Sequence, residues 1–447
     1  MGRLFGTDGV RGIANKELTP ELAMNIGRAA AYVLGNSMQK KPKILIGKDT
    51  RMSSDMLEGA LIAGICSAGA DVELLGVVPT PTVAFLVNKY DTDAGIMISA
   101  SHNPFEFNGI KIFNNDGYKL PDIIEDKIES IILDKSEVIN KTGANIGTVK
   151  RSNNALRDYI EHIKKTIDGP IDGIKVAIDC SNGSSSVTAE KLFSELGVDY
   201  HIISNSPNGF NINDECGSTH IYKLSEYVKE NKMDVGIAFD GDADRCLAVD
   251  EKGNLIDGDI IMAICAFDMK NRGILKKNTV VGTVMSNLGF IKFCKENGMN
   301  FISTKVGDRY VLETMLRENY NFGGEQSGHV IFLDHSSTGD GQLTAVQLLS
   351  VMKRSGKKIS ELASIMKKCP QVMKNVTVTA DGKIDFYTNE DIRKKIEEAK
   401  RTLGEDGRVV VRLSGTEPLV RVMVEGNDVD FINYLAEDIA NTINEKL

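Results

Sequence analysis

Tryptophan is absent from this 447-residue chain, and aromatic residues make up only 6% of it. A surface that stacks sugars on aromatic rings is therefore not expected. Long apolar runs are missing too, since no stretch approaches the ~18 uncharged apolar residues of a membrane-spanning helix. The first residues also lack the apolar segment of a secretory signal. We expect a protein that neither enters a membrane nor is secreted.

Positive charge is in short supply, because 53 Lys and Arg stand against 62 Asp and Glu, giving a net charge of −9. An acidic chain of this kind is a poor candidate for binding nucleic acid or an anionic membrane. The seven cysteines are an odd number without a C-x-x-C pair, which argues against a disulfide framework and a zinc cluster. Together these features favour the reducing cytoplasm.

The chain is too long for one hydrophobic core, and about three domains are expected from length alone. Short apolar runs alternate with helical stretches three times, beginning at Lys43, Ile174 and Asn278. This alternation predicts three similar α/β domains with mixed, largely parallel sheets. The last segment reads as strand, helix, two hairpin-like strands and helix, a smaller α+β domain. Polar stretches predict four domains: 1–152, 153–255, 256–370 and 371–447.

An unusual loop ends each of the three α/β repeats, at residues 99–104, 240–245 and 323–329. In open α/β sheets, ligands bind beyond the carboxyl ends of the strands. We therefore expect these three loops to contribute to ligand binding.

The first loop, 99–104 (SASHNP), places two serines beside a histidine and before a proline. This pattern indicates a hydroxyl held on a turn, although a plain Ser/Asn turn stopped by proline fits as well. A hydrolase nucleophile elbow is excluded, because the G-x-S-x-G pattern is missing.

The second loop, 240–245 (DGDADR), has three carboxylates at alternate positions. Gathering them is costly unless a cation neutralises them, and oxygen ligands favour Mg²⁺ or Ca²⁺. An EF-hand is not expected, because Arg245 stands at the sixth position, where that loop needs glycine. Arg245 suits a phosphate among the ligands. The alternative is a solvated acidic turn without a metal.

The third and fourth loops are 323–329 (GGEQSGH) and 412–418 (RLSGTEP), the latter followed by Arg421. Glycines let a ligand approach the backbone closely, and Glu, Ser and His suit sugar hydroxyls. Ser, Gly and Thr amides can form an anion nest, here flanked by arginines. The alternatives are a Gly-rich turn and a hairpin turn with surface arginines. The four loops together indicate phosphoryl transfer on a phosphosugar.

Five motifs occur in one order along the chain: GTDGVRG (6–12), ISASHNP (98–104), FDGDADR (239–245), GEQSGH (324–329) and RLSGTEP (412–418). They resemble the α-D-phosphohexomutase superfamily, specifically the bacterial phosphoglucosamine mutases, over essentially the whole chain. The resemblance implies three similar α/β domains and a smaller C-terminal α+β domain around a central cleft. It also implies interconversion of glucosamine 6-phosphate and glucosamine 1-phosphate through a phosphoserine enzyme, on the route to UDP-N-acetylglucosamine.

By this resemblance, Ser101 matches the phosphorylated serine. The implied metal ligands for Mg²⁺ are Ser101, Asp240, Asp242 and Asp244. The implied catalytic residues are Ser101, His102, Lys111, Arg11, Arg245 and His329. The implied substrate-binding residues are Lys305, Asp308, Arg309, Glu325, Ser327, Arg412, Ser414, Gly415, Thr416 and Arg421. A hexosamine 1,6-bisphosphate is the implied intermediate and primer, the substrate is a hexosamine phosphate, and homodimers are common in this family.

Three other functions stay open. A phosphomannomutase/phosphoglucomutase would use the same mechanism and would differ in its relative rates on hexose phosphates. A phosphatase would pass the phosphoryl group of Ser101 to water and release free phosphate. A non-catalytic sugar-phosphate sensor would carry no phosphoserine, but the intact Ser101 and acidic loop argue against it.

Overall fold

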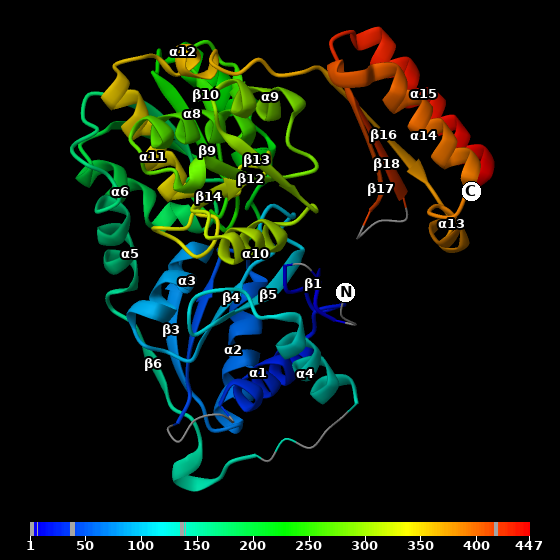
Figure 1. The fold of residues 1–447 in the computed structure, drawn as a ribbon. Coiled ribbons are helices and arrows are strands. Elements are labelled where there is room, and N and C mark those ends of the chain that lie inside the picture. Colours follow the sequence, from blue (N-terminus) through cyan, green and yellow to red (C-terminus); the bar gives the residue numbers. More distant parts are fainter. Residues whose placement is uncertain (1–3, 7, 36–40, 135–137, 139, 415–418) are drawn as a thin grey trace.

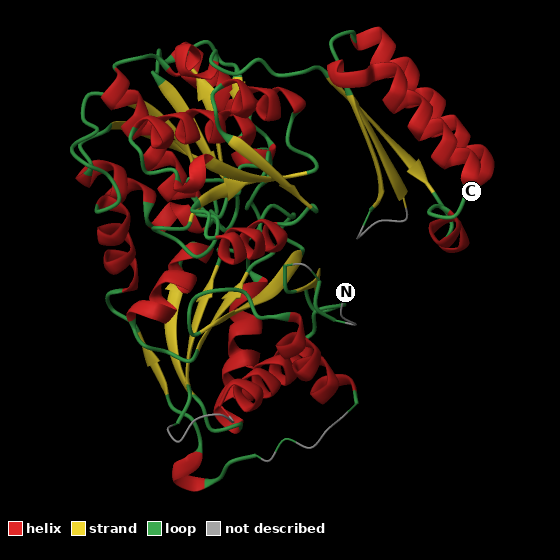
Figure 2. Ribbon diagram, in the orientation of Figure 1, coloured by secondary structure: helices red, strands yellow, loops and turns green. Residues whose placement is uncertain are grey.

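The computed structural model describes residues 4–6, 8–35, 41–134, 138, 140–414 and 419–447. Within this part of the chain the strands form four sheets, three of them mixed and one antiparallel (Figures 1 and 2). This arrangement confirms the predicted class, three α/β domains and a smaller α+β domain.

The first domain is a six-stranded sheet between two helical layers. In spatial order its strands are β1 (Val10–Ile13), β5 (Phe107–Asn114), β4 (Ala94–Ile98), β2 (Lys43–Lys48), β3 (Asp71–Val77) and β6 (Val149–Arg151). One face packs on α1 (Pro20–Gly35), α2 (Ser53–Ser67) and α4 (Asp122–Leu133), and the other on α3 (Thr80–Lys89). Because both faces are covered, the central strands read as continuous apolar runs.

The second domain has a five-stranded sheet, in the order β11 (Leu255–Ile256), β10 (Cys246–Asp250), β9 (Val235–Phe239), β7 (Lys175–Asp179) and β8 (Asp199–Ile203). Its helices are α5 (Ala155–Lys164), α6 (Ala189–Glu195) and α7 (Tyr222–Glu230). Helix α7 packs on one face through Leu224 and Val228. The other face belongs to a larger core that continues into the third domain.

The third domain has a four-stranded sheet, in the order β13 (Asn300–Thr304), β12 (Thr279–Thr283), β14 (Phe322–Gly324) and β15 (Val330–Phe332). Its helices are α8 (Gly258–Asn271), α9 (Leu288–Glu296), α10 (Asp308–Glu318), α11 (Gly341–Ser355) and α12 (Ile359–Ala363). Helices α8 and α11 pack against strands of both sheets, so one hydrophobic core joins the second and third domains. The pattern of the sequence shows two repeats here, but it does not reveal that they share a core.

The three α/β repeats have the same strand order. In each, the third strand lies parallel to the first, and an antiparallel strand follows it: β5-β4-β2-β3, β10-β9-β7-β8 and β15-β14-β12-β13. The loops 99–106, 240–245 and 325–329 all join the third strand to that antiparallel neighbour. Each predicted loop therefore occupies the same position in its repeat, at the carboxyl end of a strand, although Gly323 and Gly324 of the third predicted loop belong to β14.

The C-terminal domain is an antiparallel sheet covered on one face by helices. Its strands lie in the order β16 (Gln371–Thr377), β18 (Leu419–Glu425) and β17 (Arg408–Leu413), and its helices are α13 (Ala380–Asp385), α14 (Glu390–Leu403) and α15 (Val429–Lys446). Figure 1 shows it beside the upper body, joined by the extended segment after α12. The Arg408 guanidinium donates to the Ser286 carbonyl at 2.6 Å, which links it to the third domain.

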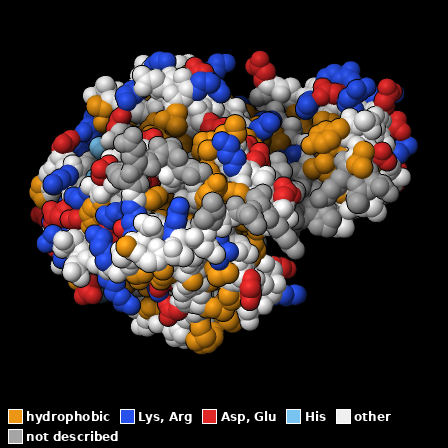
Figure 3. Space-filling model, turned by 90° about the horizontal axis from the view of Figure 1, so that it is seen from below, with side chains coloured by type: hydrophobic (Ala, Val, Ile, Leu, Met, Phe, Trp, Pro, Cys, Tyr) orange, Lys and Arg blue, Asp and Glu red, His pale blue; other side chains and the backbone are white. Residues whose placement is uncertain are grey.

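No helix in the described part of the chain is both long and apolar enough to cross a bilayer. On the face seen in Figure 3, Lys and Arg side chains are interspersed with Asp and Glu. All seven cysteines belong to the described residues, and each is a free thiol, as the sequence predicts.

Candidate active site

The serine loop (99–104) and the acidic loop (240–245) meet in the structure, although Ser101 and Asp240 are 139 positions apart in the sequence. The Ser101 hydroxyl donates a hydrogen bond of 2.6 Å to Oδ2 of Asp240, and both residues are buried. Gly241 packs against the Ser101 carbonyl so closely that a Cβ would lie 2.6 Å from its oxygen. A glycine is therefore needed at this position of the acidic loop.

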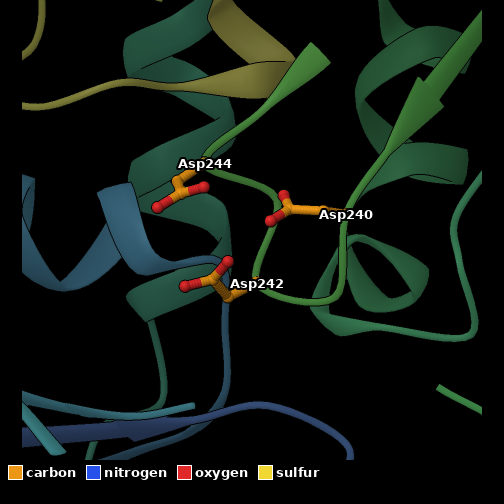
Figure 4. Close-up of side chains that lie close together, drawn as sticks. All are labelled: Asp240, Asp242 and Asp244. Carbon is orange, nitrogen blue, oxygen red and sulfur yellow. The ribbon is translucent and has the colours of Figure 1, made fainter. Parts of the chain in front are cut away.

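The three carboxylates of the acidic loop gather around one point. One oxygen each from Asp240, Asp242 and Asp244 lies within 4.8 Å of the others, and all three residues are buried. Figure 4 shows the three side chains turned toward a shared space. Oδ1 of Asp242 and Oδ1 of Asp244 have no hydrogen-bond partner among the described residues. Burial, together with the charges of Asp244 and Asp242, raises the pKa of Asp240 well above its usual value.

This cluster fits a hard divalent cation such as Mg²⁺ or Ca²⁺, because it offers oxygen ligands alone and two of its buried oxygens have no hydrogen-bond partner in the described part of the chain. Two further groups already contact it. The Thr80 hydroxyl donates to Oδ2 of Asp242 at 2.6 Å, and the Lys111 amine lies 2.8 Å from the same oxygen. Thr80 carries no signal in the sequence, since a lone threonine at the start of a helix is commonplace.

Lys111 lies on β5 with its side chain buried. Its Nζ is 3.4 Å from Oδ2 of Asp244 and 3.1 Å from Oδ2 of Asp8. Burial lowers the pKa of Lys111, but the carboxylates of Asp242, Asp8 and Asp244 outweigh it and hold the pKa well above its usual value. The amine is therefore charged and offsets part of the acidic cluster.

Asp8 organises a second set of charges that the sequence did not reveal. Its carboxylate contacts Arg11 and Lys111, and it lies 2.6 Å from the Lys119 amine. Lys119 in turn lies 2.5 Å from Oδ2 of Asp308 at the start of α10, which connects the first and third domains. In the sequence, Asp8 is marked only by its place inside the GTDGVRG motif.

Arg245 ends the acidic loop, and His329 approaches the same carboxylates from the third domain. The His329 ring lies 3.6 Å from Asp244 and 3.4 Å from Asp308. Burial lowers the pKa of His329, but the Asp244 and Asp308 charges outweigh it and raise the pKa. The Arg245 backbone N–H donates to Oδ1 of Asp240, while its Nε has no hydrogen-bond partner among the described residues. Both predicted residues therefore lie beside the carboxylates.

His102 is the neighbour of Ser101 in space as well as in sequence. Its Nδ1 lies 3.4 Å from the Ser101 hydroxyl oxygen. Burial and the positive charges of Arg245 and Arg11 lower the pKa of His102 to about 4. The imidazole is consequently neutral near pH 7.

The third predicted loop, 323–329, adjoins the segment 305–310. Oε1 of Glu325 accepts a 3.0 Å hydrogen bond from the Gly307 N–H, and burial raises the pKa of Glu325. The Ser327 hydroxyl is buried without a hydrogen-bond partner in the described structure. Lys305 places its amine 5.8 Å from the centre of the Tyr310 ring. These groups can contact the hydroxyls of a bound sugar.

Arg309 is occupied elsewhere. Its guanidinium donates to the Leu120 carbonyl and pairs with Asp122 at 2.5 Å and Glu125 at 3.2 Å, all in the first domain. In this conformation it connects two domains and does not point at the acidic loop. Strand β13 stops at Thr304, and Asp308 begins α10, so Arg309 lies in the first turn of that helix.

Arg412 and Arg421 lie directly opposite each other on β17 and β18. Burial and the charge of Arg421 lower the pKa of Arg412. Like charges that face each other across a sheet are destabilising, so a bound anion would offset their repulsion. Ser414 directly follows β17, whereas Gly415 and Thr416 lie outside the described residues. The arginine pair thus suits a phosphate dianion.

Comparison with known proteins identifies this architecture. Four domain models of the phosphoglucomutase/phosphomannomutase family match the chain: domain I at 2–138, domain II at 157–253, domain III at 257–369 and the C-terminal domain at 354–442. The phosphoglucosamine mutase of Ruminiclostridium cellulolyticum is 57% identical over 448 residues, covering 100% of both chains. The chain belongs to the phosphoglucosamine mutases, a family of isomerases.

Solved structures share the fold. A phosphoglucomutase/phosphomannomutase family protein from Burkholderia thailandensis superposes with a TM-score of 0.80 at 23% identity, covering 100% of this chain and 98% of that one. The N-acetylphosphoglucosamine mutase of Aspergillus fumigatus, in complex with GlcNAc-6P and magnesium, gives a TM-score of 0.68 at 17% identity, covering 100% and 96%. The three α/β domains and the C-terminal domain are therefore the fold of this superfamily.

Proposed function

We propose that the enzyme interconverts glucosamine 6-phosphate and glucosamine 1-phosphate through a phosphoserine at Ser101 and a hexosamine 1,6-bisphosphate. The 2.6 Å contact between the Ser101 hydroxyl and Asp240, inside the acidic cluster, carries this proposal. A serine hydroxyl is a weak nucleophile, whereas phosphoserine is a usable phosphoryl donor. Placing the donor oxygen beside a cation site suits phosphoryl transfer, which depends mainly on positioning and charge neutralisation.

Asp240, Asp242 and Asp244 would hold Mg²⁺. All three are buried, and one oxygen each of Asp242 and Asp244 has no hydrogen-bond partner among the described residues. When bound, the ion would neutralise charge on the phosphoryl oxygens. Phosphorylation of Ser101 removes its hydroxyl proton, so Oδ2 of Asp240 loses that hydrogen bond and becomes available as a ligand. Arg245, with its unpartnered Nε, would contact the same phosphoryl group.

The reaction balances without an outside reactant. In the first half, the P–O bond to Ser101 breaks as a new P–O bond forms to O1 of glucosamine 6-phosphate. The sugar hydroxyl loses a proton to a general base and the serine oxygen gains one, which we assign to Lys111, the amine that the surrounding carboxylates keep charged. The bisphosphate then turns over in the site, its P–O bond to O6 breaks as a new P–O bond forms to Ser101, and glucosamine 1-phosphate is left. His102, His329 and Arg11 complete the proposed surroundings of the reacting groups.

The rest of the substrate is held at a distance from Ser101. Glu325, Ser327, Lys305 and Asp308 are assigned to the sugar, together with Arg309 when it leaves its first-domain partners. Arg412, Ser414, Gly415, Thr416 and Arg421 are assigned to the phosphate that does not react. Seven cysteines without a disulfide fit the reducing cytoplasm that we propose as its location.

Arg412→Ala is expected to raise KM for the hexosamine phosphate by about 10-fold or more, because one charge-assisted phosphate contact contributes roughly 1.5–3 kcal/mol. Steady-state kinetics would measure the change. Arg393→Ala is a matched control, since Arg393 is an exposed arginine of the same domain, on α14. An unchanged KM in Arg412→Ala would contradict the assignment of this arginine to the phosphate.

The substrate itself is tested by a mutase assay with Mg²⁺ and a hexose 1,6-bisphosphate primer. We expect kcat/KM for glucosamine 1-phosphate to exceed the values for glucose 1-phosphate and mannose 1-phosphate by about 100-fold, roughly 2.7 kcal/mol of transition-state discrimination. Equal or better rates on glucose 1-phosphate or mannose 1-phosphate would instead indicate a phosphomannomutase/phosphoglucomutase. Steady release of free phosphate would instead favour a phosphatase.

A further inference from the structure

We propose that Arg51 and Asn213 are positioning residues that clamp Ser101 from two domains and aim its hydroxyl at the acidic cluster. The proposal rests on the proposed role of Ser101 as phosphoryl carrier. Its first observation is the backbone of Ser101, whose φ of 53° lies in the left-handed region. Residues other than glycine seldom adopt this region, and they stay there only when the surroundings hold them.

Arg51 supplies the first half of the clamp, just after β2 in the first domain. Its side chain is fully buried, and Nη2 donates to the carbonyls of Ser101 at 2.9 Å and Asn103 at 2.8 Å. The guanidinium is itself fixed by Asp49, whose Oδ2 accepts from Nε at 2.9 Å. Arg51 thus holds the serine loop through carbonyl oxygens and touches none of the reacting atoms.

Asn213 supplies the second half from the loop between β8 and α7 of the second domain. Its Nδ2 donates to the same two carbonyls, Ser101 at 2.9 Å and Asn103 at 3.1 Å. Asn213 is also left-handed, with φ of 59°, a conformation that asparagine tolerates better than most residues. A Cβ on Gly241 would lie 2.9 Å from Nδ2, so the clamp packs directly against the acidic loop.

The amide side of Ser101 is held as well. The Ser101 N–H donates to the Ser99 hydroxyl oxygen at 2.9 Å, and that hydroxyl donates to Oδ2 of Asp49 at 2.6 Å. Asp49 therefore connects Ser99, which accepts from the Ser101 N–H, with Arg51, which donates to the Ser101 carbonyl. With both backbone groups fixed, the remaining freedom of Ser101 is the rotation of its side chain, which points at Asp240.

The clamp makes the alignment depend on two domains. Arg51 belongs to the first domain, whereas Asn213 comes from the second, which also carries Asp240, Asp242 and Asp244. The second domain therefore supplies the acidic loop and, through Asn213, also holds Ser101 against that loop. Loss of Asn213 leaves the Ser101 carbonyl with Arg51 alone, and the hydroxyl is then free to move away from the cluster.

Asn213→Gly tests this directly, because glycine accepts the left-handed backbone and the substitution removes the side chain that carries the amide donor. We expect phosphorylation of Ser101 by glucose 1,6-bisphosphate, followed by intact-protein mass spectrometry, to slow by about 10–100-fold, since misplacement by about 1 Å costs on this scale. KM for the hexosamine phosphate should stay within about 2-fold, because the Arg412 and Arg421 site is separate. Arg51→Lys keeps the charge beside Asp49 but loses the planar fork, so it should slow phosphorylation in the same way.

Gln347→Ala is the matched control, since Gln347 also donates its amide to a backbone carbonyl, that of Thr166, far from the serine loop. It should lower the melting temperature without slowing phosphorylation. If Asn213→Gly is phosphorylated as fast as Gln347→Ala while Ser101→Ala is inactive, the clamp is wrong and the proposed function stands. Mutase activity in Ser101→Ala would overturn the proposed function and the clamp together.

Discussion

Ser101→Ala is expected to lower kcat by at least about 10³-fold, because the variant has no oxygen to carry the phosphoryl group. The fold should change little. Two side-chain contacts of the hydroxyl are lost, the hydrogen bond to Oδ2 of Asp240 and the 3.4 Å contact with Nδ1 of His102, and such bonds contribute about 1 kcal/mol each. A coupled mutase assay and a thermal melt would measure both effects on the same preparation.

Ser350→Ala serves as the control for this variant. Ser350 is likewise buried and hydrogen-bonded, but it lies on α11 and takes part in none of the proposed contacts with substrate. It should keep its activity with a comparable or larger loss of stability. Near-normal turnover in Ser101→Ala would rule out a phosphoserine intermediate at this position.

Asp242→Asn is expected to abolish Mg²⁺-dependent activity, again by at least about 10³-fold. It should also remove the stabilisation that Mg²⁺ gives the native enzyme, which amounts to about 2.7 kcal/mol when the ion is at 100 times its Kd. Without metal, the variant should melt close to the native protein, because relief of the repulsion that raises the pKa of Asp240 is opposed by loss of the 2.8 Å ion pair with Lys111.

Asp259→Asn is a matched control, because Asp259 is also a buried carboxylate: one oxygen accepts a backbone hydrogen bond, and the other has no partner among the described residues. Asp259 lies outside the acidic loop, so the melting temperature of the Asp259→Asn variant should still rise with Mg²⁺. The metal assignment is contradicted if Asp242→Asn keeps both its Mg²⁺ dependence and its Mg²⁺-induced rise in melting temperature.

The features that the sequence predicted are those with a local signature. Asp240, Asp242 and Asp244 stand at alternate positions of one loop, so their spacing alone gathers them. The three strand–helix repeats end in loops at equivalent positions, because apolar runs and punctuating glycines mark the strand ends. The family motifs add the connection between Ser101 and the acidic loop, which no local pattern contains.

The features that the sequence missed depend on how distant segments pack. Asp8, Lys119 and Asp308 come from three separate places, and their pairing follows from the contact between the first and third domains. Arg51 and Asn213 donate to backbone carbonyls, which every residue possesses, so no motif marks such contacts. The family resemblance implies a substrate-binding role for Arg309, whereas its partners in the first domain become apparent only in three dimensions.

The most direct measurement is a single-turnover transfer of radiolabelled phosphate. Enzyme phosphorylated on Ser101 with labelled phosphate would be mixed with unlabelled glucosamine 6-phosphate and Mg²⁺, and the products separated over time. The account predicts that label leaves the protein and appears first in the 1,6-bisphosphate and then at O1 of glucosamine 1-phosphate. Label that stays on the protein while sugar phosphate is interconverted, or that appears as free phosphate, would contradict it.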